Sequence, residues 1–281
     1  EQIANLIHCS PNEIIFTSGA TESNNISILG VINNPHRSHA ITMKTEHKSV
    51  LDVFKKIEKN GTKVSYLDVN KNGILDTEKL YDSINPNTKL ISIMLANNEI
   101  GVIQPINEVG EFCKKNNILF HVDAAQALGK LRVNLKKTSI DLMSISSHKL
   151  YGPKGVGCLY INRKTMRNKI TPLFFGGGQE LEIRPGTLAS ASIVGFGEAC
   201  KIINNEIKKD TEHIKSLTDL FLNKITSGYP DVILNGDKNN RIPGNLNFTF
   251  KGLNHEPLIP KLKNVAVSSG SACTSALPSP S

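Results

Sequence analysis

The chain has 281 residues, of which 39% are hydrophobic and 21% charged, proportions ordinary for a water-soluble globular protein. No apolar run approaches the roughly 20 residues that a membrane-spanning helix needs, and the start carries no recognisable secretory signal, so we expect no membrane partner. The net charge of +8 is spread along the chain, aromatic residues make up only 5%, and no nucleic-acid-binding motif is present. We therefore do not expect nucleic acid as the principal partner.

Short apolar runs and segments of helical period alternate along the first 161 residues. We expect strands at 13–18, 39–44, 63–69, 88–96, 118–123, 141–147 and 155–161, and helices at 21–34, 47–60, 76–84 and 106–117. This alternation, with short connections, predicts an α/β fold in which helices cover both faces of a mostly parallel central sheet.

The pattern changes near residue 190. Residues 171–190 form a loop long enough to suggest function, and 192–227 read as one long or kinked helix. We therefore expect a large domain over 1–190, and over 191–281 a linking helix and part of a smaller C-terminal α/β domain. Because the chain starts within an uncapped helix and stops just after a functional-looking loop, we expect it to be truncated at both ends.

The cysteines are widely separated, with no C-x-x-C pair and no zinc-ligand spacing. They are Cys9, Cys113, Cys158, Cys200 and Cys273. An odd, scattered set of this kind predicts no metal site and indicates a reducing compartment, so we expect a cytoplasmic protein.

Lys149 lies at the centre of SISSHKLYGPKG, next to His148 and before a glycine-rich turn. Asp123 ends the apolar run ILFHVD, 26 residues before Lys149. A pyridoxal phosphate site needs these two groups, a lysine to form a Schiff base and a carboxylate to keep the pyridine nitrogen protonated. The alternative for Asp123 is a helix cap before the following AAQALG segment.

Further polar residues follow other expected strands. In TSGATESNN (17–25), Gly19 and Thr21 open a helix whose N-terminus suits a phosphate, although Thr21 could equally be an ordinary helix cap. His47 could stack on the pyridine ring or move protons, or could be a surface residue at a helix start. Asn98 and Gln126 could bind the ring oxygen, and the alternative for Asn98 is a simple turn.

Cys273 differs from the other four cysteines in its surroundings. It lies in SSGSACTSA, a run of small residues that suits a mobile, accessible thiol. Cys158, in contrast, lies in the apolar strand GVGCLYI, where a thiol is a packing residue. We therefore expect Cys273 to be the reactive cysteine.

Seven motifs together resemble one family, the cysteine desulfurases. In order, they are TSGATESNN, TEHKSV, NNEIG, HVDAAQ, SISSHKLYGPKG, GGGQE…RPGT and SSGSACTSA. The resemblance spans nearly the whole chain and is to the subgroup with a long cysteine loop, which serves iron–sulfur cluster and thiolation pathways. It implies a homodimeric fold-type I pyridoxal phosphate enzyme that converts L-cysteine to L-alanine and passes the sulfur to an iron–sulfur scaffold or another acceptor protein.

The resemblance also implies roles for single residues. Lys149 is similar to the lysine that carries the cofactor, and Cys273 to the nucleophile that becomes a persulfide and could contact a nascent iron–sulfur cluster. The other residues with implied roles are Asp123 (ring nitrogen), Gln126 and Asn98 (ring oxygen), His47 (stacking and proton transfer), Ala20, Thr21, Ser146 and His148 (phosphate), and Thr187 (the phosphate of the other subunit).

The sequence departs from the family pattern at Leu181 and Glu182, where the family tends to have Arg or Lys followed by Gly. The family also continues at both ends beyond this chain, on one side to an arginine that binds the substrate carboxylate. Two alternatives stay open at this stage. One is another fold-type I enzyme, such as an aminotransferase or selenocysteine lyase, and the other is a non-catalytic scaffold.

Overall fold

A seven-stranded sheet forms the centre of the computed structural model, which describes residues 1–166, 169–253 and 259–268. The strand order is β1-β7-β6-β5-β4-β2-β3, and all strands run in one direction except β7, which is antiparallel to both of its neighbours. The strands are β1 (Ile14–Thr17), β2 (His39–Met43), β3 (Lys63–Leu67), β4 (Thr88–Met94), β5 (Leu119–Asp123), β6 (Leu142–Ser146) and β7 (Gly157–Ile161). The predicted α/β class and mostly parallel sheet are confirmed.

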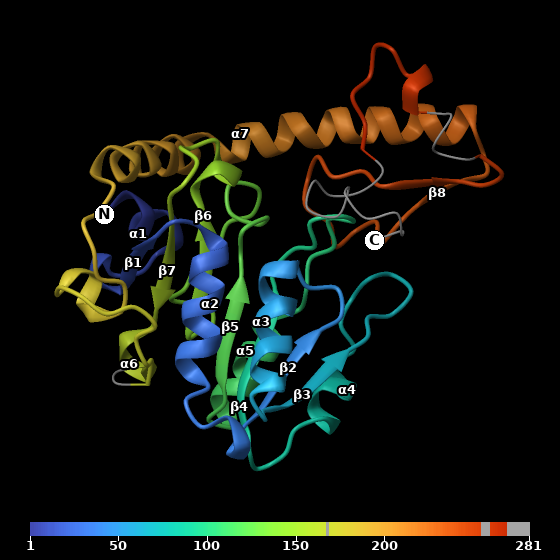
Figure 1. Ribbon diagram of the computed structural model, residues 1–281. Coiled ribbons are helices and arrows are strands. Elements are labelled where there is room, and N and C mark those ends of the chain that lie inside the picture. The colour runs from blue at the N-terminus through green and yellow to red at the C-terminus, as the bar shows by residue number, and fades with distance from the viewer. Residues whose placement is uncertain (167–168, 254–258, 269–281) are drawn as a thin grey trace.

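Helices cover both faces of this sheet (Figure 1). One face packs against α2 (Ala20–Val31) and α3 (Lys48–Lys59), and the other against α1 (Gln2–Ile7), α5 (Ile106–Lys115) and the start of α7 (Ser190–Gly228). Two short helices, α4 (Thr77–Asp82) and α6 (Arg163–Met166), lie in connections. Every helix predicted from the periodicity is present, with ends within three residues of those expected.

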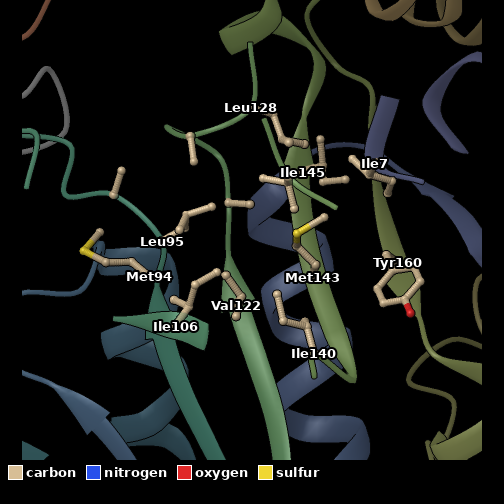
Figure 2. Packing of buried hydrophobic residues seen from close by; sticks show 14 of the residues in the cluster. Ile7, Met94, Leu95, Ile106, Val122, Leu128, Ile140, Met143, Ile145 and Tyr160 are labelled. Carbon is tan, nitrogen blue, oxygen red and sulfur yellow. The ribbon is translucent and has the colours of Figure 1, made fainter. Parts of the chain in front are cut away.

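Alternation along the strands explains why both faces are covered. On β6, Met143 and Ile145 belong to the larger core cluster, and Leu142 belongs to the cluster under α2 and α3. Figure 2 shows Met143, Ile145 and Val122 in the larger cluster, with Ile106 of α5 packed among them. Strands buried on both faces are typical of parallel sheets.

Helix α7 is 39 residues long, and only its first half is buried. Phe196, Cys200 and Ile203 pack on the sheet domain. The second half extends past the sheet towards the strand β8 (Figure 1). The single long helix predicted for 192–227 is therefore confirmed.

The described residues after α7 form a small antiparallel ribbon of β8 (Val232–Leu234) and β9 (Phe248–Phe250). The sequence analysis expected part of a smaller α/β domain here without assigning its strands, so neither β8 nor β9 has a counterpart among the predicted strands. A one-turn helix follows at Ile259–Lys261. In the part of the chain that the structure describes, no helix is long and apolar enough to cross a membrane.

Candidate active site at the carboxyl edge of the sheet

The carboxyl ends of the six co-directional strands share one edge of the sheet, the usual ligand side of an open α/β fold. Nine of the eleven candidate residues lie at or just after these ends. They are Ala20 and Thr21 after β1, His47 after β2, Asn98 after β4, Asp123 and Gln126 at β5, and Ser146, His148 and Lys149 at β6. The topology thus gathers residues that are far apart in the sequence.

The turn between β1 and α2 is the candidate phosphate site. Gly19 is the N-cap of α2 and makes no side-chain cap, so neither Ser18 nor Thr21 caps this helix. The turn lies directly on β7, because a Cβ atom added to Gly157 would be 2.6 Å from the Gly19 Cα atom. Exposed N–H groups at a helix start carry partial positive charge and favour a phosphate.

Asp123 ends β5 as a buried carboxylate with two hydrogen-bond donors. Its Oδ1 atom accepts the Ala125 N–H at 2.9 Å, and Oδ2 accepts from the Asn24 amide at 2.9 Å. Burial raises the pKa of Asp123, and both hydrogen bonds and His47 oppose that rise. Asp123 stabilises a turn rather than capping a helix, so the helix-cap alternative is wrong.

A second carboxyl group, Glu46, is buried close to Asp123. Its Oε1 atom accepts the Met94 N–H at 2.6 Å, and its Oε2 atom has no partner among the described residues. Burial raises the pKa of Glu46 well above its usual range, and the charge of Asp123 adds to the rise. The sequence analysis did not identify Glu46, although it lies in the quoted TEHKSV motif.

His47 is the N-cap of α3, and its half-buried ring is held by Ser49. The Nδ1 atom accepts the Ser49 N–H at 3.1 Å and lies 2.8 Å from the Ser49 hydroxyl oxygen. Both bonds go to the same nitrogen, so the other ring nitrogen, Nε2, is left for other contacts. The ring can therefore cap the helix and still take part in chemistry.

Lys149 lies in a one-turn 3-10 helix (Ser147–Leu150) directly after β6, and its side chain is exposed. The preceding Ser146 hydroxyl lies 2.9 Å from the His148 Nδ1 atom. Burial lowers the pKa of the neighbouring Lys130, and the positive charge of Lys149 lowers it further. An exposed primary amine beside a serine–histidine pair is the arrangement expected from the SISSHKLYGPKG motif.

The remaining candidates differ in how they are held. Gln126 is half-buried, and its Oε1 atom accepts from Lys130 at 3.2 Å. Asn98 is half-buried, but its neighbour Asn97 organises the turn by accepting two backbone N–H groups, each at 2.9 Å. Thr187 is exposed in the loop before α7.

Comparison with known proteins decides the family. A model of the family described as aminotransferase class-V matches residues 1–280. A protein named cysteine desulfurase IscS from Rickettsia typhi is 51% identical over 281 residues, 99% of this chain and 68% of the relative. A protein of the same name from Ehrlichia chaffeensis is 50% identical over 283 residues, all of this chain and 69% of the relative. The chain belongs to the cysteine desulfurases of the class-V aminotransferase family.

Solved structures agree with this assignment. DndA from Streptomyces lividans has a TM-score of 0.86 and 38% identity, covering 94% of this chain and 75% of that one. SspA in complex with cysteine has a TM-score of 0.83 and 36% identity, covering 98% of this chain and 77% of that one. The expected fold-type I architecture of this cysteine desulfurase family is therefore confirmed.

Class-V aminotransferases and cysteine desulfurases are pyridoxal phosphate enzymes, and the residues of this edge fit that cofactor. Asp123 is a buried carboxylate that forms no ion pair with any described residue. It is therefore available to pair with the protonated ring nitrogen of the cofactor. The start of α2 suits the phosphate, and Lys149 presents an exposed amine. Within the described ranges, no cluster of three or more possible metal ligands occurs.

One expected residue lies outside this description, and two unexpected residues lie within it. Cys273, the expected nucleophile, lies outside the described residues. Asn24 and Ser49 contact the candidate residues directly but were not identified from the sequence. Both lie within quoted motifs, TSGATESNN and TEHKSV. The buried face of α2 also carries Ser23 and Ser27, so no contrast with apolar neighbours marked Asn24 in the sequence.

Proposed function

We propose that this protein is a pyridoxal phosphate-dependent cysteine desulfurase. It converts L-cysteine to L-alanine and transfers the sulfur to Cys273, which becomes a persulfide. The observation that carries the proposal is the convergence of Lys149, Asp123 and the start of α2 at one edge of the sheet, in a chain that is 51% identical to a cysteine desulfurase. A persulfide formed in this way supplies sulfur for iron–sulfur clusters or tRNA thiolation.

Each candidate residue then has a part in holding the cofactor. The helix start at Ala20 and Thr21, together with Ser146 and His148, would hold the phosphate, and Thr187 would reach the phosphate of a second subunit. Asp123 would hold the ring nitrogen, and His47 would stack on the ring. Gln126 and Asn98 would bind the ring oxygen, and the Nε2 atom of Gln126 is available because Lys130 occupies Oε1.

The cofactor, when bound, supplies an electron sink for the electron pair left as the α C–H bond of the substrate breaks. The Lys149 amine is the base that takes this proton and returns a proton to the α-carbon at the end of the reaction, while the β-carbon takes up the proton lost by the Cys273 thiol. His47 assists these proton transfers through Nε2. Asp123, held by two donors, keeps its negative charge next to the ring nitrogen.

The sulfur-transfer step balances without a further reactant. The Cys273 thiolate attacks the substrate sulfur, so that one S–S bond forms and the C–S bond of the substrate breaks. The electron pair of that bond goes to the β-carbon, which takes up a proton. L-cysteine and the Cys273 thiol thus become L-alanine and a Cys273 persulfide, which an acceptor protein then consumes.

Three features of the wider setting are part of this proposal. The enzyme acts as a homodimer, because Thr187 serves the site of the partner subunit. An iron–sulfur scaffold or another sulfur-acceptor protein binds near Cys273. The enzyme works in the cytoplasm, which is supported by four free cysteines among the described residues, Cys9, Cys113, Cys158 and Cys200.

The test measures sulfur transfer directly. After brief exposure to L-cysteine, mass spectrometry of the protein should find one added sulfur, about 32 Da, on the peptide that contains Cys273, because an accessible thiol takes up such a reversible cap. Cys273→Ser should still bind the cofactor but release no alanine, since a hydroxyl cannot accept the sulfur.

Cys9→Ser is the matched control. Burial raises the pKa of the Cys9 thiol to about 12, so this half-buried cysteine should be unreactive and the variant should behave as wild type. Wild-type release of alanine and sulfide by Cys273→Ser would move the protein to another class of pyridoxal phosphate enzyme. Failure of the wild type to bind pyridoxal phosphate would leave only a scaffold role.

A further inference from the structure

Asn24 is a fully buried polar residue that contacts the candidate site from α2. It lies on the inner side of α2 with 0% of its surface exposed. Its Nδ2 atom lies 2.9 Å from Asp123 Oδ2 and 2.9 Å from the Ser49 hydroxyl oxygen. A carboxylate only accepts hydrogen bonds, so the amide nitrogen of Asn24 must face Asp123, and both of its N–H groups are used.

The contacts continue from Ser49 to His47. The Ser49 hydroxyl accepts from Asn24 and lies 2.8 Å from the His47 Nδ1 atom. The backbone N–H of Ser49 points at the same nitrogen, at 3.1 Å. Because Nδ1 accepts this backbone N–H it carries no proton, so the Ser49 hydroxyl donates to it and the proton of the neutral ring lies on Nε2.

Asn24 also acts against the effect of burial on Asp123. Burial raises the pKa of Asp123, and Glu46 is a second buried carboxyl group close by. The Ala125 N–H opposes this rise, and Asn24 is the one side chain among the described residues that donates a hydrogen bond to the carboxylate. Removing it would leave Oδ2 buried without a donor.

We propose that Asn24 is a positioning residue that keeps Asp123 ionised and oriented, and that ties it through Ser49 to His47. Asp123, Asn24, Ser49 and His47 then form one hydrogen-bonded unit, which we call the Asn24 relay. The Asn24 relay fixes the ring proton of His47 on Nε2. The inference rests on the proposed function only in assigning Asp123 to the ring nitrogen of the cofactor.

A double-mutant cycle tests the link to Asp123. Asn24→Leu, which is similar in size and cannot donate, is made in the wild type and in the Asp123→Asn protein. In the wild type it should weaken pyridoxal phosphate binding about tenfold or more, because a hydrogen bond to a charged group is lost. In the Asp123→Asn background the loss should be less than about threefold, because only a neutral contact remains.

The same cycle is measured on the apoprotein by urea unfolding, which needs no cofactor. Asn24→Leu should lower the midpoint clearly more in the wild type than in the Asp123→Asn background. Equal effects in the two backgrounds, in both measurements, would show a merely structural role and overturn the proposal. Ser27→Ala is the control, because Ser27 is buried on the same helix and bonds the Ser23 carbonyl oxygen at 2.8 Å.

If Asn24→Leu does not fold, the proposal is tested at the His47 end of the Asn24 relay. Nitrogen-15 NMR of the imidazole in the apoprotein should show the proton on Nε2 in the wild type and in Ser49→Thr, which keeps a hydroxyl, and a changed Nδ1 signal in Ser49→Ala. A wild-type ring with its proton on Nδ1 would overturn the proposal. Failure of the wild type to bind pyridoxal phosphate would overturn the proposed function, while the NMR and urea results would still decide on the relay.

Discussion

Asp123 and Glu46 are two buried carboxyl groups that differ in the number of donors they receive. Asp123 accepts from a backbone N–H and from an amide, whereas Glu46 accepts one backbone N–H. Burial raises the pKa of both, and the charge of Asp123 raises the pKa of Glu46 further. The member of such a pair that accepts more hydrogen bonds holds a negative charge more readily, which favours ionisation of Asp123 over that of Glu46.

At the same scale, Lys149 is the residue whose loss should have the most specific effect. Lys149→Ala should remove the visible absorbance band of the bound cofactor and reduce alanine release to background, because the variant lacks the amine that forms the Schiff base. The side chain is exposed, so the free energy of unfolding of the apoprotein should change by less than about 0.5 kcal/mol.

Borohydride reduction of the wild type, followed by peptide mapping, provides the direct measurement. The cofactor should be found on the peptide that contains Lys149. Lys154→Ala is the matched control, because Lys154 is exposed in the same glycine-rich turn and should leave the band intact. Labelling of Lys154 or Lys130 in place of Lys149 would contradict the assignment.

At the scale of elements, the loop before α7 is held against the start of α2. The Arg184 Nε atom lies 2.9 Å from the Glu22 Oε1 atom, and the Glu180 carboxylate accepts the Phe16 N–H. Burial raises the pKa of Glu22, but hydrogen bonds from Ser18 and Arg184 outweigh this effect, and the pKa is lowered overall. These contacts hold the loop that carries Thr187 next to the turn between β1 and α2.

The same loop contains the departure from the family pattern. Glu180, Leu181 and Glu182 have φ angles of 49°, 60° and 64°, in the left-handed region that favours glycine. Leu181 and Glu182 occupy the positions where the family tends to have Arg or Lys followed by Gly. The backbone therefore keeps a conformation that suits glycine at 182 even though a glutamate stands there, at some cost in strain.

Arg184→Ala should release this loop. Loss of a partly buried, charge-assisted contact should lower the free energy of unfolding by about 1–3 kcal/mol and speed chymotrypsin cleavage at the exposed Phe175. Limited proteolysis followed by mass spectrometry measures the effect. Lys201→Ala removes an exposed ion pair with Glu198 on α7 and should change neither quantity. Equal rates of cleavage in Arg184→Ala and the wild type would show that the Arg184–Glu22 ion pair, which acts as a clamp, does not hold the loop.

At the scale of the whole molecule, a buried histidine links the central strands. His121 on β5 is 0% exposed, with its Nδ1 atom 2.8 Å from the Ser92 hydroxyl of β4 and its Nε2 atom 2.9 Å from the Ser144 hydroxyl of β6. Burial lowers the pKa of His121 to about 3. The neutral ring is thus part of the folded sheet, whereas the unfolded chain protonates near pH 6.5.

This difference predicts acid sensitivity of the fold. The contribution of His121 should be complete above pH 6.5 and should be lost as the pH falls towards 3, with a slope of up to about 1.4 kcal/mol per pH unit. His121→Gln should flatten the pH dependence of the free energy of unfolding in this window, measured by urea titration. His213→Gln, at an exposed site on α7, should leave the slope unchanged. An unchanged slope in His121→Gln would contradict the prediction.

The sequence by itself determined the α/β class, the order of strands and helices, and the residues that follow the strands. Helical and strand periods are local properties, so segments such as 47–60 and 118–123 could be read without a partner. The motifs around Lys149 and Asp123 are also local, because each combines a strand end with its turn. The strands β8 and β9 were not predicted, because strands of three residues carry too little pattern.

Only the tertiary structure decided which polar groups meet. Asn24 and Asp123 are 99 residues apart in the sequence, and their contact exists because α2 packs against the sheet beside the end of β5. The burial of Glu46 beside Asp123 and the clamp between Arg184 and Glu22 depend on long-range packing in the same way. Hydrogen bonds and desolvation are set by distance in space, and a linear pattern of residues does not encode those distances.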